Sequence, residues 1–156
     1  MTEFKKILCP IDLDNDSLPA LECARDLAQR TGATLYVLNA ARTPAPDMDV
    51  PVAIGPHPHW EEAARHRLEQ LAGQCLQGKV PYQIVVRNGI PETVIVEAAA
   101  ELKADLIVMT THGRTGLAHF ILGSVAETVI READCAVLTV KAKPAANQRG
   151  TGLRKS

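Results

Sequence analysis

Near the start of the chain, a residue with a carboxylate side chain stands directly after a predicted buried strand. Asp12 follows the run 4–11, which ends in Pro10-Ile11. A carboxylate in that place can accept hydrogen bonds from ribose hydroxyls, or it can cap the helix that follows. The residues alone leave both roles open.

A second stretch combines glycines with a helix start. Gly113 and Gly123 allow the backbone to approach a ligand closely or to take a positive φ. Ser124 opens a predicted helix and Glu127 follows three residues later, which is the capping-box pattern. Capping alone explains this spacing as well as ligand binding does.

The same helix start could bind an anion. Free N–H groups at Gly123, Ser124 and Val125, assisted by the helix dipole, would suit a phosphate. Two familiar phosphate motifs, G-x-x-x-x-G-K-[ST] and G-x-G-x-x-G, do not occur in the sequence. The chain is therefore predicted to be neither a Walker-type NTPase nor a standard dinucleotide binder.

Strand-like and helix-like segments alternate along the chain. The predicted strands are 4–11, 34–38, 82–86, 105–109 and 136–140, and the predicted helices cover 18–28, 60–75, 91–102 and 125–130. Asp14, Asp16 and Ser17 are all candidates to cap the first helix, and Gly32 suits its C-terminal cap. The alternation predicts a single α/β domain with a doubly wound, five-stranded parallel sheet and helices on both faces.

Two segments lack periodicity. The connection 41–59 carries five prolines and is predicted to be a long irregular loop. His57 and His59 within it have a spacing that metals can use, but no third ligand is nearby, so no metal site is expected. The domain is predicted to span residues 1–141, followed by a disordered basic tail over 142–156.

Bulk composition excludes several classes of protein. The 156 residues include 17 basic and 18 acidic side chains, and a net charge of −1 gives no general attraction to nucleic acid or membrane. There is no apolar run long enough to cross a bilayer and no signal-peptide pattern, so a cytoplasmic location is expected. The four cysteines are scattered singly, which predicts small buried apolar side chains rather than a zinc or disulfide framework.

Three segments together resemble the universal stress protein family. They are Pro10-Ile11-Asp12, Gly89-Ile90-Pro91 and the run 108–131, and the resemblance extends over roughly residues 4–141. The nucleotide-binding branch of that family carries a glycine, two residues, a glycine, nine residues, a glycine and then Ser or Thr. This chain keeps Gly113, Gly123 and Ser124 but has Thr110 in place of the first glycine.

The resemblance implies a strand order of 3-2-1-4-5 and an adenine nucleotide, ATP, ADP or AMP, with or without Mg²⁺. It implies that Asp12 contacts ribose, that Val37 offers its backbone to adenine and that Gly123, Ser124 and Val125 hold phosphates. The full set of implied nucleotide-binding residues is Pro10, Ile11, Asp12, Val37, Met109, Thr110, Gly113, Arg114, Gly123, Ser124 and Val125. Arg114 could contact a polyphosphate or remain a solvated loop residue.

Dimerisation through the last strand, Ala136–Val140, is also implied by the resemblance. We therefore expect a dimeric stress-response or signalling protein that binds adenine nucleotide. No catalytic residue stands out, so at most slow hydrolysis or autophosphorylation is expected. Two alternatives are a nucleotide-free dimer that acts as an interaction module, which Thr110 favours, and an enzyme of the related adenylate-forming or ATP-hydrolysing α/β folds.

Overall fold

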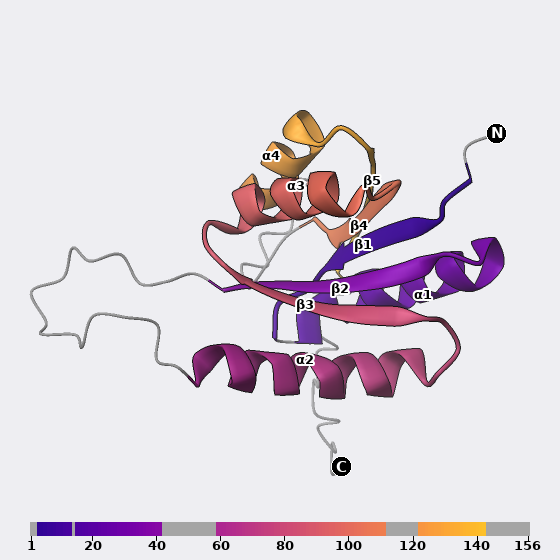
Figure 1. Cartoon of the computed structure of the whole chain (residues 1–156). Coiled ribbons are helices and arrows are strands. Elements are labelled where there is room, and N and C mark those ends of the chain that lie inside the picture. Colours follow the sequence, from indigo (N-terminus) through magenta and orange to yellow (C-terminus); the bar gives the residue numbers. More distant parts are fainter. Residues whose placement is uncertain (1–2, 14, 42–58, 112–121, 143–156) are drawn as a thin grey trace, which may run out of the picture.

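Figure 1 shows the computed structural model of the chain, with one central sheet and helices on both sides of it. The structure describes residues 3–13, 15–41, 59–111 and 122–142. The proline-rich segment 42–58, most of the loop 110–122 and the tail 143–156 lie outside the described residues. The division into a domain and a tail therefore stays a prediction.

The sheet contains five parallel strands in the order β3-β2-β1-β4-β5. The strands are β1 (Lys6–Pro10), β2 (Thr34–Ala41), β3 (Tyr82–Asn88), β4 (Leu106–Thr110) and β5 (Ala136–Val140). The predicted fold class and strand order are both confirmed. β2 extends three residues beyond the predicted end at 38, because it pairs with β3 as far as Ala41↔Asn88.

Four α-helices connect the strands. They are α1 (Leu18–Thr31), α2 (Trp60–Leu76), α3 (Pro91–Leu102) and α4 (Ser124–Glu132), and a 3-10 turn, η1 (Asn15–Ser17), precedes α1. Ser17 occupies the N-cap of α1, and Gly32 ends that helix in the left-handed conformation with φ 73°. Pro91 stands in the first turn of α3, where its missing N–H costs no hydrogen bond.

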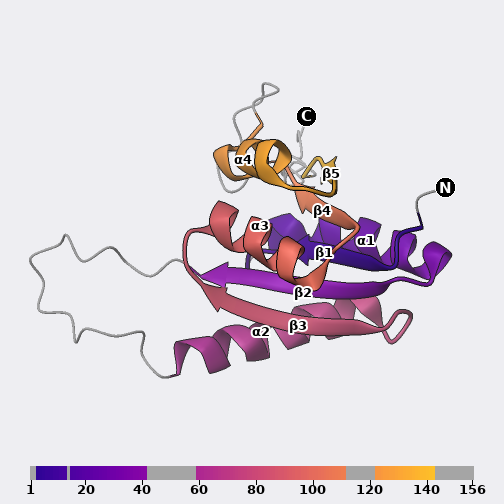
Figure 2. The same cartoon turned by 45° about the horizontal axis from the view of Figure 1, so that its top comes forward.

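The strands are buried on both faces, and successive residues alternate between two cores. Ile7 and Cys9 of β1 pack with α1 and α2, whereas Leu8 packs with α3 and α4. Figure 2 shows the two helix layers on opposite sides of the sheet. This two-sided burial explains why the strands appear in the sequence as nearly continuous apolar runs. Trp60, at the start of α2, packs against the first core.

The turn between β3 and α3 depends on a glycine, and this gives a stability prediction. Gly89 has φ +147°, and a Cβ added there would lie 2.8 Å from Cγ2 of Val94. Gly89→Ala should therefore lower the free energy of unfolding by about 1–3 kcal/mol, measured by urea denaturation. Gly73→Ala is the matched control, because nothing lies within 4 Å of its added Cβ. In the interior of α2 that substitution should stabilise by about 1 kcal/mol. Equal effects of the two substitutions would contradict this account.

Candidate functional site

The polar residues singled out in the sequence lie at the carboxyl edge of the sheet, around the ends of β1 and β4. β1 pairs with β4 through Ile7↔Leu106 and Leu8↔Ile107. The chain runs from β1 outward to β2 and β3 on one side, and β4 and β5 complete the other side. The ends of β1 and β4 therefore flank the point where the strand order reverses, which is the usual ligand position in open α/β sheets.

The turn after β1 is tightly held. Ile11 is buried, and its N–H donates to the Leu38 carbonyl at 2.8 Å. The Asp12 N–H donates to Oγ of Ser17 at 2.9 Å, and Asp12 itself is exposed. Since Ser17 is the N-cap of α1, Asp12 does not occupy the capping position of that helix. The capping role expected for Asp12 is therefore not observed at the start of α1.

Val37 does not lie where the resemblance implied. It is fully buried in the middle of β2, paired with Cys9 on one side and Ile84 on the other. Its backbone therefore belongs to the interior of the sheet and does not reach the edge. A backbone group that reaches this edge from β2 would have to belong to a residue nearer the end of the strand.

Hydrogen bonding along β2 identifies Ala40 as that residue. The Thr34 N–H donates to Lys5 and the Leu38 carbonyl accepts from Ile11, so even-numbered residues of β2 direct their backbone groups toward β1. β1 ends at Pro10. The backbone of Ala40 therefore faces the space beyond the end of β1. The sequence missed this position because the strand was predicted to end at residue 38.

The end of β4 and the start of α4 form the other side of the site. Met109 is buried, and Thr110 is partly buried at the last position of the strand. The Thr111 N–H donates to the Val140 carbonyl at 3.1 Å, which ties this segment to β5. A threonine side chain thus stands at the end of this strand.

The start of α4 differs from the sequence prediction in two ways. Gly123 is the N-cap, Ser124 is the first helical residue and no side chain caps the helix, so the predicted capping box does not form. The Gly123 N–H is not free either, because it donates to the Thr111 carbonyl at 2.6 Å. Gly123 has φ −60°, so its role does not require a positive φ. Gly113 and Arg114 lie outside the described residues.

Of the three amides expected to bind an anion, those of Ser124 and Val125 remain available at this helix start. The first bond within α4 runs from the Glu127 N–H to the Gly123 carbonyl at 2.9 Å. The N–H groups of Ser124 and Val125 precede that bond, so they have no intrahelical acceptor. The exposed hydroxyl of Ser124 lies beside them. These groups and the helix dipole favour one negatively charged group at the carboxyl edge.

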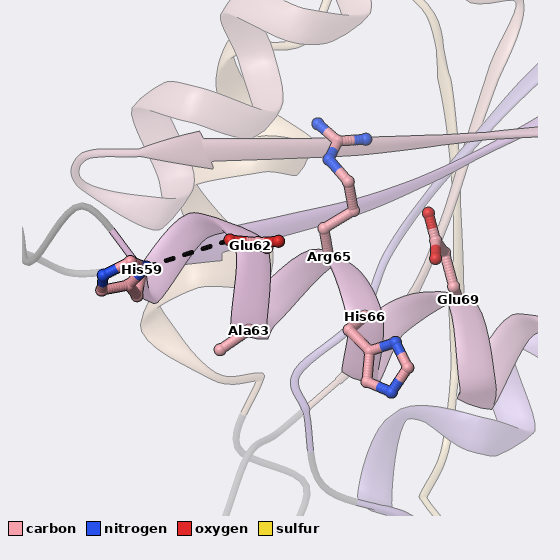
Figure 3. Close-up of a pocket in the computed structure, with 6 residues that line it drawn as sticks. All are labelled: His59, Glu62, Ala63, Arg65, His66 and Glu69. Atoms are coloured by element: carbon pink, nitrogen blue, oxygen red, sulfur yellow. Dashed lines mark ion pairs between the residues drawn. The ribbon is translucent and has the colours of Figure 1, made fainter.

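Two hollows elsewhere on the surface do not contain the predicted site residues. One of them, of about 510 Å³, lies along α2, and Nδ1 of His59 there lies 3.9 Å from Oε2 of Glu62. Figure 3 shows the residues that line it. The other, of about 420 Å³, lies between α1 and the end of β5. No group of three His, Cys, Asp or Glu side chains that could hold a metal ion occurs among the described residues. None of the described helices is long and apolar enough to span a membrane.

Comparison with known proteins places the chain in a family. Residues 3–141 match the model of the Universal stress protein family. The chain belongs to the universal stress protein family. A universal stress protein of Methanocaldococcus jannaschii is 35% identical over 145 residues, which cover 88% of this chain and 82% of that protein. A universal stress protein of Thermus aquaticus is 36% identical over 143 residues, covering 88% and 99% of the two chains.

A solved structure of this family has the same architecture. The crystal structure of a universal stress protein in complex with cAMP superposes with a TM-score of 0.65 at 25% identity. The alignment covers 91% of this chain and all of that one, 100%. The family and the fold predicted from the sequence are therefore confirmed over nearly the whole described part of the chain.

Cys9 lies next to the site but is not suited to act as a nucleophile there. Burial in the first core raises the pKa of the Cys9 thiol, and Cys75 and Cys23 raise it further. In the unfolded chain a thiol ionises near pH 8.5, roughly, whereas the folded protein keeps the Cys9 proton. The free energy of unfolding should therefore fall as the pH rises above about 9.

Cys9→Ala should reduce the slope of unfolding free energy against pH by up to about 1.4 kcal/mol per pH unit. Urea denaturation at pH 8 to about 10.5 measures this slope. The slope is the quantity of interest, because the lost side chain also lowers stability at every pH. An unchanged slope, or rapid alkylation of Cys9 in the native protein, would contradict the assignment of a buried, protonated thiol.

Proposed function

We propose that this chain is a cytoplasmic adenine-nucleotide-binding protein that acts as a homodimer in stress response or signalling. The observation that carries the proposal is the convergence of Asp12, after β1, with the end of β4 and the amides at the start of α4. The carboxylate suits a ribose and the helix start suits a phosphate, and the two lie on opposite sides of the point where the strand order reverses. The family member solved with cAMP supports the same ligand class.

The proposed pose follows from the positions of these groups. Asp12 accepts hydrogen bonds from the ribose hydroxyls, with Pro10 and Ile11 beside it. The backbone of Ala40 takes the role that was expected of Val37 toward adenine. Met109 and Thr110 line the site from β4, and Ser124 and Val125 bind phosphate through their N–H groups. Gly113 and Arg114 remain candidates for the phosphate side.

Binding accounts for the site better than catalysis does. The groups that converge at the edge are a carboxylate and backbone amides, which suit binding, whereas acid–base catalysis requires a general base positioned by a partner. A Mg²⁺ ion accompanying ATP or ADP would be held mainly by phosphate oxygens and water, since this ion keeps several waters. At most we propose slow hydrolysis or autophosphorylation.

A nucleotide-free dimer that serves as an interaction module is the second candidate. Two observations favour it. Thr110 carries a side chain at the end of β4, and the Gly123 N–H is already bonded to the Thr111 carbonyl. Thr110 leaves less room for a polyphosphate than a glycine would. The bonded Gly123 N–H leaves one donor fewer than a free amide would. The two candidates differ in one measurable property, which is nucleotide affinity.

Calorimetric titration of nucleotide-stripped protein separates them. We expect ATP or AMP to bind the wild type. Gly123→Val should weaken the affinity at least about tenfold, because the side chain would stand beside the phosphate-binding amides. The extended backbone of Gly123, φ −60° and ψ 152°, accepts valine without strain. Ser124→Ala, which removes one hydroxyl, should have a smaller effect. No binding at millimolar nucleotide would reject the proposal in favour of the nucleotide-free module.

The two edges of the sheet differ in how well they suit pairing with a second copy. β3 is shielded, because Nη1 of Arg65 donates to the Ile84 carbonyl at 3.4 Å, and β3 also carries Arg87. β5 has the uncharged sequence AVLTV, and Leu138 is 38% exposed. Charged residues protect edges from pairing and uncharged edges permit it. This contrast supports dimerisation through β5.

A proline in β5 tests that interface. The Val140 carbonyl faces β4, where it accepts from Thr111, so the N–H of Thr139 points to the open edge. Thr139→Pro removes that outward donor without removing a bond to β4. We expect a dimer for the wild type and a monomer for Thr139→Pro by sedimentation velocity. Tyr82→Pro, at the start of the opposite edge strand, is the control and should remain dimeric. A dimeric Thr139→Pro would exclude β5 pairing.

A further inference from the structure

Two buried polar side chains bind the same peptide group. Within the described residues, Ser17 and Asn39 are the polar residues in the buried class, 3% and 4% exposed. Nδ2 of Asn39 donates to the Ile11 carbonyl at 3.0 Å. Oγ of Ser17 accepts the Asp12 N–H at 2.9 Å. That carbonyl and that N–H are the two ends of the peptide between Ile11 and Asp12.

The orientation of this peptide is therefore fixed from two sides. Asn39 reaches it from the end of β2, and Ser17 reaches it from the start of α1. The preceding peptide is held as well, because the Ile11 N–H donates to the Leu38 carbonyl at 2.8 Å. Buried polar groups are retained where their hydrogen bonds are satisfied, and such bonds fix geometry. The peptide cannot rotate without breaking a buried hydrogen bond.

The Ser17 hydroxyl is used in an unusual way. A serine at an N-cap ordinarily accepts a hydrogen bond from an amide in the first turn of its own helix. Ser17 is the N-cap of α1, yet no side-chain cap bond forms there. Its hydroxyl serves the Asp12 N–H instead. The start of α1 therefore has no side-chain cap, and the Ser17 hydroxyl holds the turn at Asp12 instead.

We infer that Ser17 and Asn39 are positioning residues that hold the Asp12 carboxylate in place for the ribose hydroxyls of a bound nucleotide. The inference rests on the proposed function. Asp12 is exposed, and the clamped peptide fixes the backbone from which its carboxylate extends toward the edge of the sheet. A carboxylate that is oriented before the ligand arrives loses less conformational entropy on binding. The discrimination in favour of ribose should therefore depend on both positioning residues.

The test compares AMP with 2′,3′-dideoxy-AMP, which lacks both hydroxyls, by calorimetric titration. The measured quantity is the ratio of the two dissociation constants. Asp12→Ala should abolish the preference for AMP. Ser17→Ala and Asn39→Ala should each reduce the ratio about tenfold, the size expected for losing a well-placed hydrogen bond to a charged group. In the Asp12→Ala background neither substitution should change the ratio further.

Two controls separate positioning from a general loss of stability. Ser17→Thr keeps the hydroxyl and should keep the ratio near that of the wild type. Leu76→Ala removes a fully buried side chain at the end of α2, so it should lower stability and leave the ratio unchanged. Because Ser17 and Asn39 reach the peptide from different elements, Ser17→Ala decides the question if Asn39→Ala fails to fold.

Amide hydrogen exchange tests the clamp without ligand. In the nucleotide-free protein, exchange of the Asp12 N–H should be about tenfold faster in Ser17→Ala than in the wild type. Equal losses of AMP and dideoxy-AMP affinity, or effects that add to that of Asp12→Ala, would overturn the positioning role while the proposed function stood. Absence of binding of both ATP and AMP to the wild type would overturn the proposed function itself, and the ribose assignment with it.

Discussion

The lateral pairing of β1 with β4 is the contact on which the candidate site depends. These strands are separated by two complete strand–helix units in the sequence, yet they are neighbours in the sheet. Because parallel strands all end at the same edge, their adjacency brings the turn at Asp12 next to the segment that leads into α4. Helices on both faces then bury the strands and leave this edge as the place where polar backbone groups meet solvent.

The two cores explain how rigidly that edge is held. Ile7, Cys9 and Val37 pack under α1 and α2, and Leu8 and Leu38 pack under α3 and α4. Since neighbouring residues of one strand belong to opposite cores, a shift of register would move every one of these side chains to the wrong face. The turn after β1 continues directly from these fixed strands. Its hydrogen bonds to Asn39 and Ser17 hold the next two residues, Ile11 and Asp12, in place as well.

The opposite side of the site is organised differently. Its backbone is fixed by the bond from Gly123 to the Thr111 carbonyl and by the bond from Thr111 to Val140. These bonds hold the start of α4 against the ends of β4 and β5, but they use one amide that the sequence had suggested for phosphate. The candidate site therefore combines a carboxylate on a fixed turn with fewer helix amides for a phosphate than the sequence suggested, and the two candidate functions differ in whether this arrangement binds nucleotide.

The sequence by itself determined the element order, the parallel sheet and the family. Apolar runs buried on both faces and helices with 3.6-residue periodicity are local patterns, and Gly32 and Pro91 mark helix ends through their own backbone preferences. Only the tertiary structure decided which backbone groups face the site. The end of β2 depends on pairing with β3, so Ala40 could not be distinguished from Val37 in advance. The engaged Gly123 amide depends on Thr111, and the clamped peptide at Asp12 depends on Asn39 of β2 as well as on the nearby Ser17. Local patterns contain no information about such hydrogen bonds.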